Sequence, residues 1–242
     1  MNELLVADLG SVPYSAALEL QRDLARRRIT GEIAEDVLLL VEHPPVVTLG
    51  RTAKNANLLA SPEFLSDRGV ELFEVERGGD ITFHGPGQLV GYPIIDLKRH
   101  RKDLHWYLRQ VEQALIDAIA EFGLSGGRVE KYTGVWVGTN DAVRPRKLAS
   151  IGVHARDWVT WHGFALNVNT DLSYFDLIVP CGISDVTMTS VAREAKLGSV
   201  DMAMAATAVT HAFGRVFNLT PRSVTLAEIT AGLATVAGDG SA

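Results

Sequence analysis

The chain has 242 residues, of which 47% are hydrophobic and 21% charged, with 22 glycines, 9 prolines and one cysteine. This composition is typical of a folded globular protein, and it excludes a disordered, collagen-like or disulfide-stapled chain. The formal net charge of -6 argues against a protein that binds nucleic acid nonspecifically.

The location expected from the sequence is the cytoplasm. A single cysteine cannot form an internal disulfide, which favours a reducing compartment. The N-terminal stretch MNELLVADLG lacks the basic and apolar regions of a secretory signal. No uncharged window reaches the ~20 apolar residues that a membrane span needs, so no membrane association is expected.

Helix signals and short apolar runs follow one another along the chain. The predicted helices show apolar residues at helical spacing or a capping residue, and they span 13–31, 61–69, 103–123 and about 200–217. The predicted strands are short apolar runs between turn residues, at 37–41, 46–49, parts of 70–93, 135–137, 148–153 and 164–168.

These elements predict an α+β fold with a mixed sheet and helices on one face. A doubly wound nucleotide-binding fold is disfavoured because strands and helices do not alternate regularly. Because the chain shows neither a repeat nor a low-complexity linker, we expect one domain over residues 1–235 and a loose tail over 236–242. The stretch after about Ser184 is an alternative candidate for a smaller subdomain.

Two residues stand out as candidate reactive groups. Cys181 lies between Pro180 and Gly182, which predicts a sharp turn that presents its side chain. Lys147 opens the strand KLASIGV, where alternation would place it on the same face as Ala149. Taken alone, a single cysteine is more often a small buried hydrophobe, and a lysine at a strand end is more often solvated.

Two further segments are rich in small residues. RGGDITFHGPGQ, which begins at Arg77, holds four glycines and matches neither GxGxxG nor a phosphate-binding GK[ST] loop, so alone it reads as hairpin turns. In WHGFALN, Gly163 and Ala165 share one face of the predicted strand. That face either leaves room for a ligand or allows close packing of another backbone.

Metal and serine-hydrolase sites are not expected. The histidines form no HExxH motif, and His100 and His105 would point to different faces of a helix. GxSxG, the usual serine-hydrolase elbow, is absent.

Four segments taken together carry a family resemblance. RGGDITFHGPGQ, KLASIGV, WHGFALNVN and PCGI follow in the order and spacing of the lipoyl(octanoyl) transferases, so the chain resembles that family from about Val37 to Arg193. The resemblance implies the mostly antiparallel sheet of the biotin/lipoate ligase fold. It also implies an enzyme that moves an octanoyl group from acyl carrier protein, through a thioester, to a lysine of a lipoyl domain, in the first step of protein lipoylation.

The resemblance also implies residue roles. It replaces the interpretation of Cys181 as a small buried hydrophobe and of Lys147 as a solvated residue at a strand end. These two match the family's catalytic pair, with the lysine ammonium favouring the thiolate and later acting as a base. Asp80 falls in a matched segment, but its carboxylate is given no role of its own. The substrate-binding positions implied are Arg77, Gly78, Gly79, Asp80, Ile81, Thr82, Phe83, His84, Ser150, Ile151, Gly152, Gly163, Phe164 and Ala165.

No cofactor is expected, because the donor carries its acyl group on phosphopantetheine as an activated thioester. Neither ATP nor a metal is then required. The expected partners are acyl carrier protein as donor, and lipoyl domains of 2-oxoacid dehydrogenase complexes and the glycine cleavage H protein as acceptors. The basic run Arg144, Arg146 and Lys147 is a candidate contact for such acidic partners. The alternatives are an ATP-dependent lipoate or biotin-type ligase, and a catalytically silent module that binds carrier proteins.

Overall fold

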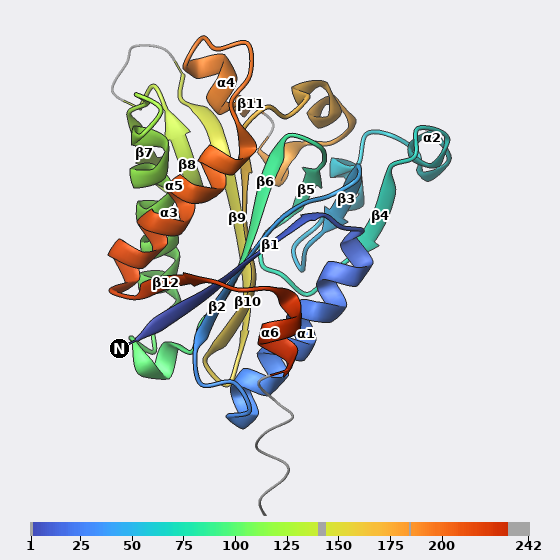
Figure 1. Ribbon diagram of the computed structural model, residues 1–242. Coiled ribbons are helices and arrows are strands. Elements are labelled where there is room, and N and C mark those ends of the chain that lie inside the picture. The colour runs from blue at the N-terminus through green and yellow to red at the C-terminus, as the bar shows by residue number, and fades with distance from the viewer. Residues whose placement is uncertain (1, 140–143, 184, 232–242) are drawn as a thin grey trace, which may run out of the picture.

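A large sheet crosses the protein and a smaller sheet lies beside it (Figure 1). The structure, a computed structural model, describes residues 2–139, 144–183 and 185–231. The predicted tail at 236–242, and with it the end of the predicted domain, lies outside these residues.

The large sheet has the strand order β12-β1-β2-β6-β10-β9-β8-β7, with β11 paired to β9. Its strands are β1 (Glu3–Ser11), β2 (Asp36–Glu42), β6 (Gln88–Ile94), β7 (Gly126–Val129), β8 (Tyr132–Val137), β9 (Arg146–Arg156), β10 (Val159–Asn167), β11 (Thr187–Met188) and β12 (Thr220–Ser223). Neighbours run antiparallel from β2 to β7, whereas β1 runs parallel to β2 and β12, and β11 parallel to β9. The expected mixed, mostly antiparallel sheet is confirmed.

Helices cover both faces of this sheet, so the expectation of helices on one face is wrong. On one face pack α3 (Leu104–Ala120) and α5 (Met202–Phe217), and on the other α1 (Tyr14–Thr30) and α6 (Leu226–Ala231), as Figure 1 shows on the two sides of β1. The physical reason lies in the central strands. In β1, Leu4 and Val6 belong to the core under α3 and α5, and Leu5 and Ala7 to the core under α1. A strand that is apolar on both faces needs a helix layer on each.

Two of the predicted helix ends, at Asp103 and Gly31, are confirmed by their caps. Asp103 accepts a hydrogen bond from the Trp106 backbone N–H at the start of α3. Asp201 does the same for Ala203 at the start of α5. Gly31 ends α1 in a left-handed conformation, with a φ of 83°. These side chains and this glycine satisfy backbone groups that a helix leaves unpaired at its ends.

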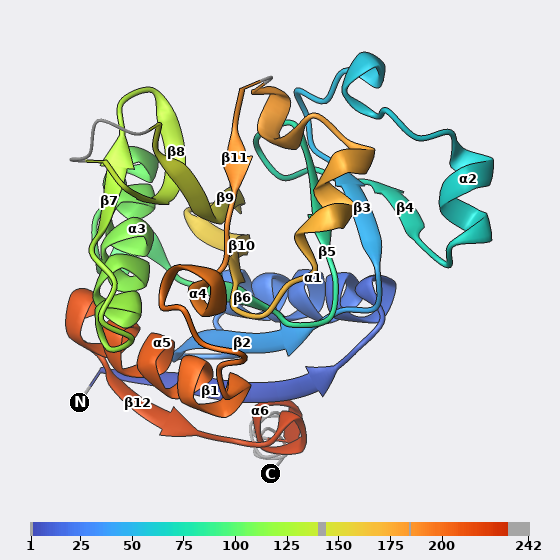
Figure 2. The ribbon, with the colours of Figure 1, turned by 90° about the horizontal axis from the view of Figure 1, so that it is seen from above.

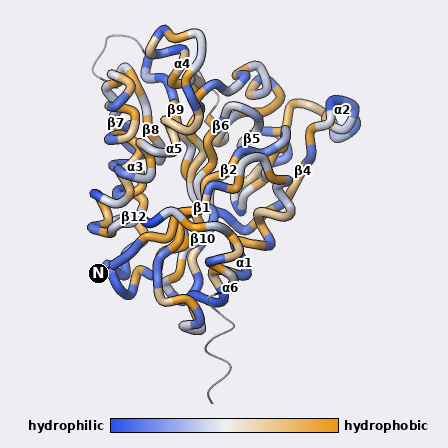
Figure 3. The backbone as a smooth tube through the Cα atoms, in the orientation of Figure 1, coloured by the Kyte–Doolittle hydropathy of each residue, from blue (hydrophilic) through white to orange (hydrophobic). Residues whose placement is uncertain are grey.

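The small sheet forms a platform beside the large one (Figure 2). Its order is β4-β3-β5, with the strands β3 (Val46–Leu49), β4 (Glu71–Glu74) and β5 (Ile81–His84). The hydrophilic helix α2 (Pro62–Asp67) lies at its outer edge, as Figure 3 shows. The short helical turns η3 (Leu172–Leu177) and η4 (Pro180–Gly182) pack against β5. Cys181 is therefore carried on a segment supported by the small sheet and faces the large one.

Candidate active site

Cys181 lies in a strained turn. Its φ of 57° and ψ of 16° are left-handed values inside η4, and its side chain is partly buried. A hydrogen bond joins this turn to Asn57, because the Val179 N–H donates to the Asn57 carbonyl oxygen at 2.7 Å. Gly182 has a φ of 68°, which favours glycine, and a β-carbon there would lie 2.6 Å from Asp80 Oδ2. Left-handed backbone at a non-glycine residue costs free energy, and such strain gathers at functional sites.

Lys147 meets the thiol from the large sheet. Its side chain is only 2% exposed, and Nζ donates a hydrogen bond to Cys181 Sγ at 3.1 Å. The Trp136 ring centroid is 5.2 Å from Nζ. In the described part of the chain no carboxylate oxygen lies within ion-pair distance of Nζ. A buried ammonium needs a compensating charge, and the thiolate of Cys181 is the group placed to supply it.

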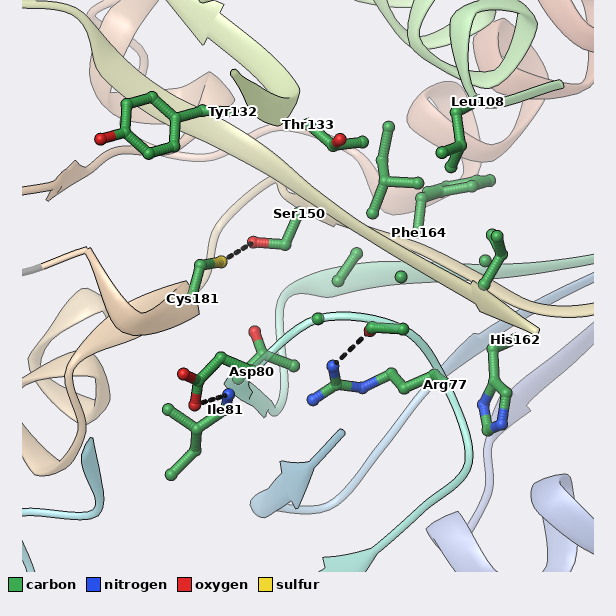
Figure 4. A pocket seen from close by; sticks show the side chains of 18 of the residues that line it. Arg77, Asp80, Ile81, Leu108, Tyr132, Thr133, Ser150, His162, Phe164 and Cys181 are labelled. Carbon is green, nitrogen blue, oxygen red and sulfur yellow. Dashed lines mark hydrogen bonds between the residues drawn. The ribbon is translucent and has the colours of Figure 1, made fainter. Parts of the chain in front are cut away.

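Ser150 supplies a third polar group beside the sulfur. Its Oγ lies 3.8 Å from Cys181 Sγ (Figure 4). The expected alternation along β9 is interrupted here, because Leu148 and Ala149 both belong to the hydrophobic core and the pairing of β8 with β9 shifts register at this point. The prediction that Lys147 shares a face with Ala149 is therefore wrong. The shift lets Lys147 and Ser150 reach the same sulfur.

A glycine on β8 provides the space for the Lys147 side chain. A β-carbon at Gly134, whose φ is 140°, would lie 2.7 Å from Lys147 Cε and 2.5 Å from the Ala149 carbonyl oxygen. The Gly134 N–H donates to Glu112 Oε1 at 3.1 Å, and this buried carboxylate is paired with Arg109 and Arg128. Glu112 thus holds the backbone against which the catalytic candidate Lys147 lies.

We expect Gly134→Ala to lower the free energy of unfolding by about 1–3 kcal/mol, the cost of a strained backbone residue. We also expect it to raise the pH at which Cys181 reacts with iodoacetamide, since the added β-carbon pushes the ammonium away from the sulfur. Gly123→Ala is the matched control, because Gly123 is also left-handed but has open space around it. The control should lose stability and keep the alkylation profile; an unchanged profile in Gly134→Ala would contradict the assignment.

The pair opens onto a cavity of about 520 Å³ between the two sheets. Its size is that of a pocket for a small molecule or an acyl chain. Apolar side chains from β6, α3, β9 and β10 line it, namely Val90, Leu104, Leu108, Ile151, Val153, Phe164 and Ala165. Figure 4 shows Cys181 and Ser150 at one part of this pocket and Phe164 and His162 at others.

Of the substrate-binding positions implied by the resemblance, all but one line this cavity. Those that line it are Arg77, Gly78, Gly79, Asp80, Ile81, Thr82, His84, Ser150, Ile151, Gly152, Gly163, Phe164 and Ala165. Phe83 does not line it: its ring stacks on Tyr174 and meets Phe175 edge-on in the core of the small sheet. Alternation along β5 turns Phe83 away while Thr82 and His84 face the cavity.

Arg77 and Asp80 use their polar atoms within the protein. The Arg77 guanidinium donates to Thr48 O at 2.7 Å and to Gly78 O at 3.1 Å, and burial lowers its pKa. Asp80 accepts from Asn57 Nδ2 and from the Ile81 N–H, both at 2.7 Å. Both side chains therefore hold the glycine-rich loop and the Cys181 turn in place.

Gly163 lines the cavity and also allows close packing of backbone. A β-carbon there would lie 2.2 Å from the Gly91 carbonyl oxygen of β6. Gly152 is similar, since its β-carbon would lie 2.8 Å from the Gly78 carbonyl oxygen. These glycines bring the strand and loop backbones together along the cavity wall.

The sequence did not point to several residues of the cavity. Tyr14, Tyr92 and His162 line it together with His84. The Tyr14 and His84 rings stack at 5.9 Å, and His43 Nε2 lies 2.7 Å from the Tyr92 hydroxyl. Burial lowers the pKa of His43 to about 4 and that of His84 to about 3. These histidines are neutral at physiological pH.

Acidification from pH 7 to pH 5 is therefore expected to lower the stability of the fold. The folded pKa values of His43 and His84 lie below the ordinary 6.5, so the unfolded chain takes up protons first as the pH falls. Below pH 6.5, the free energy of unfolding then falls by about 1.4 kcal/mol per pH unit for each of the two histidines. Urea unfolding at pH 7, 6 and 5 measures how the free energy of unfolding changes with pH. This pH dependence should be unchanged in the control His211→Gln, which replaces an exposed histidine. Equal stability at pH 7 and 5 would contradict buried neutral histidines.

The described residues lack two further kinds of feature. No group of three or more histidine, cysteine or acidic side chains in the described ranges is placed to hold a metal ion. Nor does any described helix have the length and apolar character to cross a membrane.

Comparisons with known proteins agree with the geometry. Residues 13–214 match the family model for the lipoyl protein ligase A/B catalytic domain. An octanoyltransferase of Myxococcus xanthus is 48% identical over 219 residues, which cover 90% of this chain and 60% of that protein. An octanoyltransferase of Solibacter usitatus is 48% identical over 218 residues, 90% of this chain and 94% of that protein. The structure of a bi-partite lipoate protein ligase from Thermoplasma acidophilum has a TM-score of 0.74 at 18% identity, covering 98% of this chain and 92% of that one.

Proposed function

Because the chain belongs to the lipoyl protein ligase A/B catalytic domain family, and within it to the octanoyltransferases, we propose that it transfers octanoyl groups through a thioester on Cys181. The observation that carries this proposal is the 3.1 Å hydrogen bond between Lys147 Nζ and Cys181 Sγ at the cavity. The acceptors are lipoyl domains, with the glycine cleavage H protein among them, and the donor is octanoyl acyl carrier protein.

The first half-reaction is attack by the Cys181 thiolate on the carbonyl carbon of the donor thioester. The Lys147 ammonium favours the thiolate, which is the reactive form of a cysteine. The carbon–sulfur bond to phosphopantetheine breaks as the new thioester forms, and the departing thiolate takes the proton from Lys147. Cys181 then carries the octanoyl group and Lys147 is left as a neutral amine.

The second half-reaction is attack by the acceptor lysine on the Cys181 thioester. That lysine must lose a proton to become a stable amide, and the neutral Lys147 amine is placed to accept it. The carbon–sulfur bond breaks, Cys181 leaves as a thiolate and Lys147 is again an ammonium. Ser150 Oγ, 3.8 Å from Sγ, is a hydroxyl donor near the carbonyl oxygen on which negative charge develops.

The cavity supplies the recognition of the chain. An octanoyl group buries about six methylenes at ~0.8 kcal/mol each, which amounts to roughly 5 kcal/mol. The apolar side chains of β9, β10 and α3 along the wall fit that role. A thioester donor is already activated, so the reaction as proposed uses neither ATP nor a metal ion.

Two other functions make different demands on the site. An ATP-dependent ligase would activate a free acid and would give the Cys181–Lys147 pair no task. A silent module that binds carrier proteins would not need a lysine buried against a thiol. The thiol–ammonium contact favours the transferase over both.

One incubation separates the three functions. The protein is mixed with octanoyl acyl carrier protein without ATP, and peptides are analysed by mass spectrometry before and after addition of a lipoyl domain. We expect octanoyl on Cys181 first and octanoyl-lysine on the lipoyl domain afterwards, with neither in Cys181→Ala. Transfer from free octanoate that requires ATP would instead indicate a ligase, and binding without any adduct a silent module.

Donor docking gives a smaller effect. Of the two arginines expected to meet acidic partners, Arg146 makes a bidentate ion pair with Glu194 at 2.8 and 2.9 Å, which ties it to the protein. Arg144 is 78% exposed and faces Asp185 at 3.9 Å. Arg144→Glu is expected to raise the KM for the donor a few-fold and to weaken its dependence on salt. Arg222→Glu, at the far strand of the sheet, is the control; equal effects in both would exclude docking at Arg144.

A further inference from the structure

The site places two nucleophiles side by side. Cys181 Sγ and Lys147 Nζ are 3.1 Å apart at the cavity wall. We propose, on the basis of the thioester function above, that octanoyl-Cys181 also passes its acyl group to Lys147 when no acceptor arrives. Lys147 is then an internal acylation site, and its product is an octanoyl-lysine inside the active site.

Distance supports this transfer. The carbonyl carbon of an octanoyl thioester is bonded directly to Sγ, and Nζ is already in contact with that sulfur. The electrophilic carbon would therefore lie one bond from an atom that Nζ already contacts, and holding two reacting groups next to each other removes most of the entropic cost of meeting. The acceptor lysine of a lipoyl domain has to dock from solution, whereas Lys147 is always present.

The surroundings of Lys147 hold its side chain beside Cys181. Its side chain is buried, and its stem lies against the Gly134 backbone, with Cε 2.7 Å from the position of a β-carbon. The Trp136 ring closes another side at 5.2 Å from Nζ. Among the described residues, no carboxylate forms an ion pair with Nζ that would draw the side chain out toward solvent.

Acylation of the sulfur changes the charge balance in favour of attack. In the free enzyme the thiolate compensates the buried ammonium. Once Cys181 is acylated, the sulfur is neutral and a charge on Lys147 is left without its partner. In the first half-reaction proposed above, the departing thiolate takes the proton of Lys147, which leaves a neutral amine beside the thioester.

The step balances without any co-reactant. The neutral amine adds to the thioester carbonyl, the carbon–nitrogen bond forms and the carbon–sulfur bond breaks. The proton released from nitrogen goes to the departing thiolate, which leaves a free Cys181 thiol and an amide at Lys147. The chain stays in the same cavity, whose volume of about 520 Å³ leaves room for it.

Acylation of Lys147 inactivates the enzyme. An amide nitrogen neither carries the charge that favours the thiolate nor accepts a proton. The acyl-enzyme therefore partitions between productive transfer and self-acylation, and the concentration of the acceptor sets the ratio.

The test follows both adducts over time. The protein is incubated with octanoyl acyl carrier protein and no acceptor, and samples are treated with hydroxylamine, which cleaves thioesters and leaves amides. We expect a labile octanoyl group on Cys181 first, and then a resistant one on Lys147 that rises as transferase activity falls. The exposed Lys54 and Lys102 serve as internal controls and should stay unlabelled. Excess lipoyl domain should reduce the resistant adduct at least tenfold.

Each other outcome separates the two proposals. A labile adduct on Cys181 that persists without any resistant adduct on Lys147 overturns self-acylation and leaves the transferase function standing. Absence of both adducts contradicts the transferase function. Resistant octanoyl on Lys147 in Cys181→Ala, where no thioester is formed, shows direct acylation by the donor and overturns transfer from sulfur to nitrogen.

Discussion

Lys147→Arg is expected to form octanoyl-Cys181 and to pass it to a lipoyl domain at least ~100-fold more slowly, the usual scale for loss of a general base. A guanidinium keeps the positive charge next to Sγ, which favours the thiolate, but it stays protonated at any working pH and cannot take the acceptor's proton. Mass spectrometry of the acyl-enzyme and single-turnover transfer measure the two steps separately. Since a guanidinium is not acylated, this variant should also keep its thioester longer than the natural protein.

Lys147→Met is the companion variant, because it removes the charge as well. Cys181 should then react with iodoacetamide only at higher pH. Circular dichroism must first show that both variants are folded. Full transfer activity in Lys147→Arg would mean that charge alone suffices, and it would direct the search for the base to His84, which lines the same cavity.

The fold was predictable where one face of an element is polar. The stripe of α3 and its Asp103 cap predicted the start of that helix to within a residue and placed its end three residues too late. The strand β1 was missed, although Leu4 to Ala7 form an unbroken apolar run like the one that predicted the strand at 37–41, and all four are buried. The same property, burial on both faces, is what requires the second helix layer. Local periodicity does not reveal which strands become central.

The site was predictable where its residues are close in sequence and form motifs. Cys181, Lys147 and the glycine-rich loop belong to such segments. Gly134, Trp136 and Tyr14 contribute through tertiary contacts between distant elements, and no local pattern indicates them. Phe83 lies in the same motif but outside the cavity lining, because its ring packs in the core of the small sheet.

Replacement of Cys181 is expected to abolish transfer, with a loss of about 10⁴-fold or more, the scale reached when an acting nucleophile is removed. The loss should be the same for Cys181→Ala and Cys181→Gly, since neither side chain forms a thioester. Measurement of lipoyl-domain octanoylation with each purified variant gives the comparison. Transfer above that level in either variant would contradict a covalent role for Cys181.

The two variants should differ in stability, in the order opposite to that of ordinary core positions. Both leave Lys147 without its sulfur partner, so that cost cancels between them. The φ of 57° at position 181 is strained for alanine by about 1–2 kcal/mol and unstrained for glycine. Glycine in turn loses about 0.4–1 kcal/mol of stability relative to alanine, because its unfolded chain has more conformational entropy. Cys181→Gly is therefore expected to melt about 2–4 °C above Cys181→Ala. A lower melting temperature for the glycine variant would show that the turn holds no strain, whereas the expected order would show that the turn bears a backbone cost at position 181.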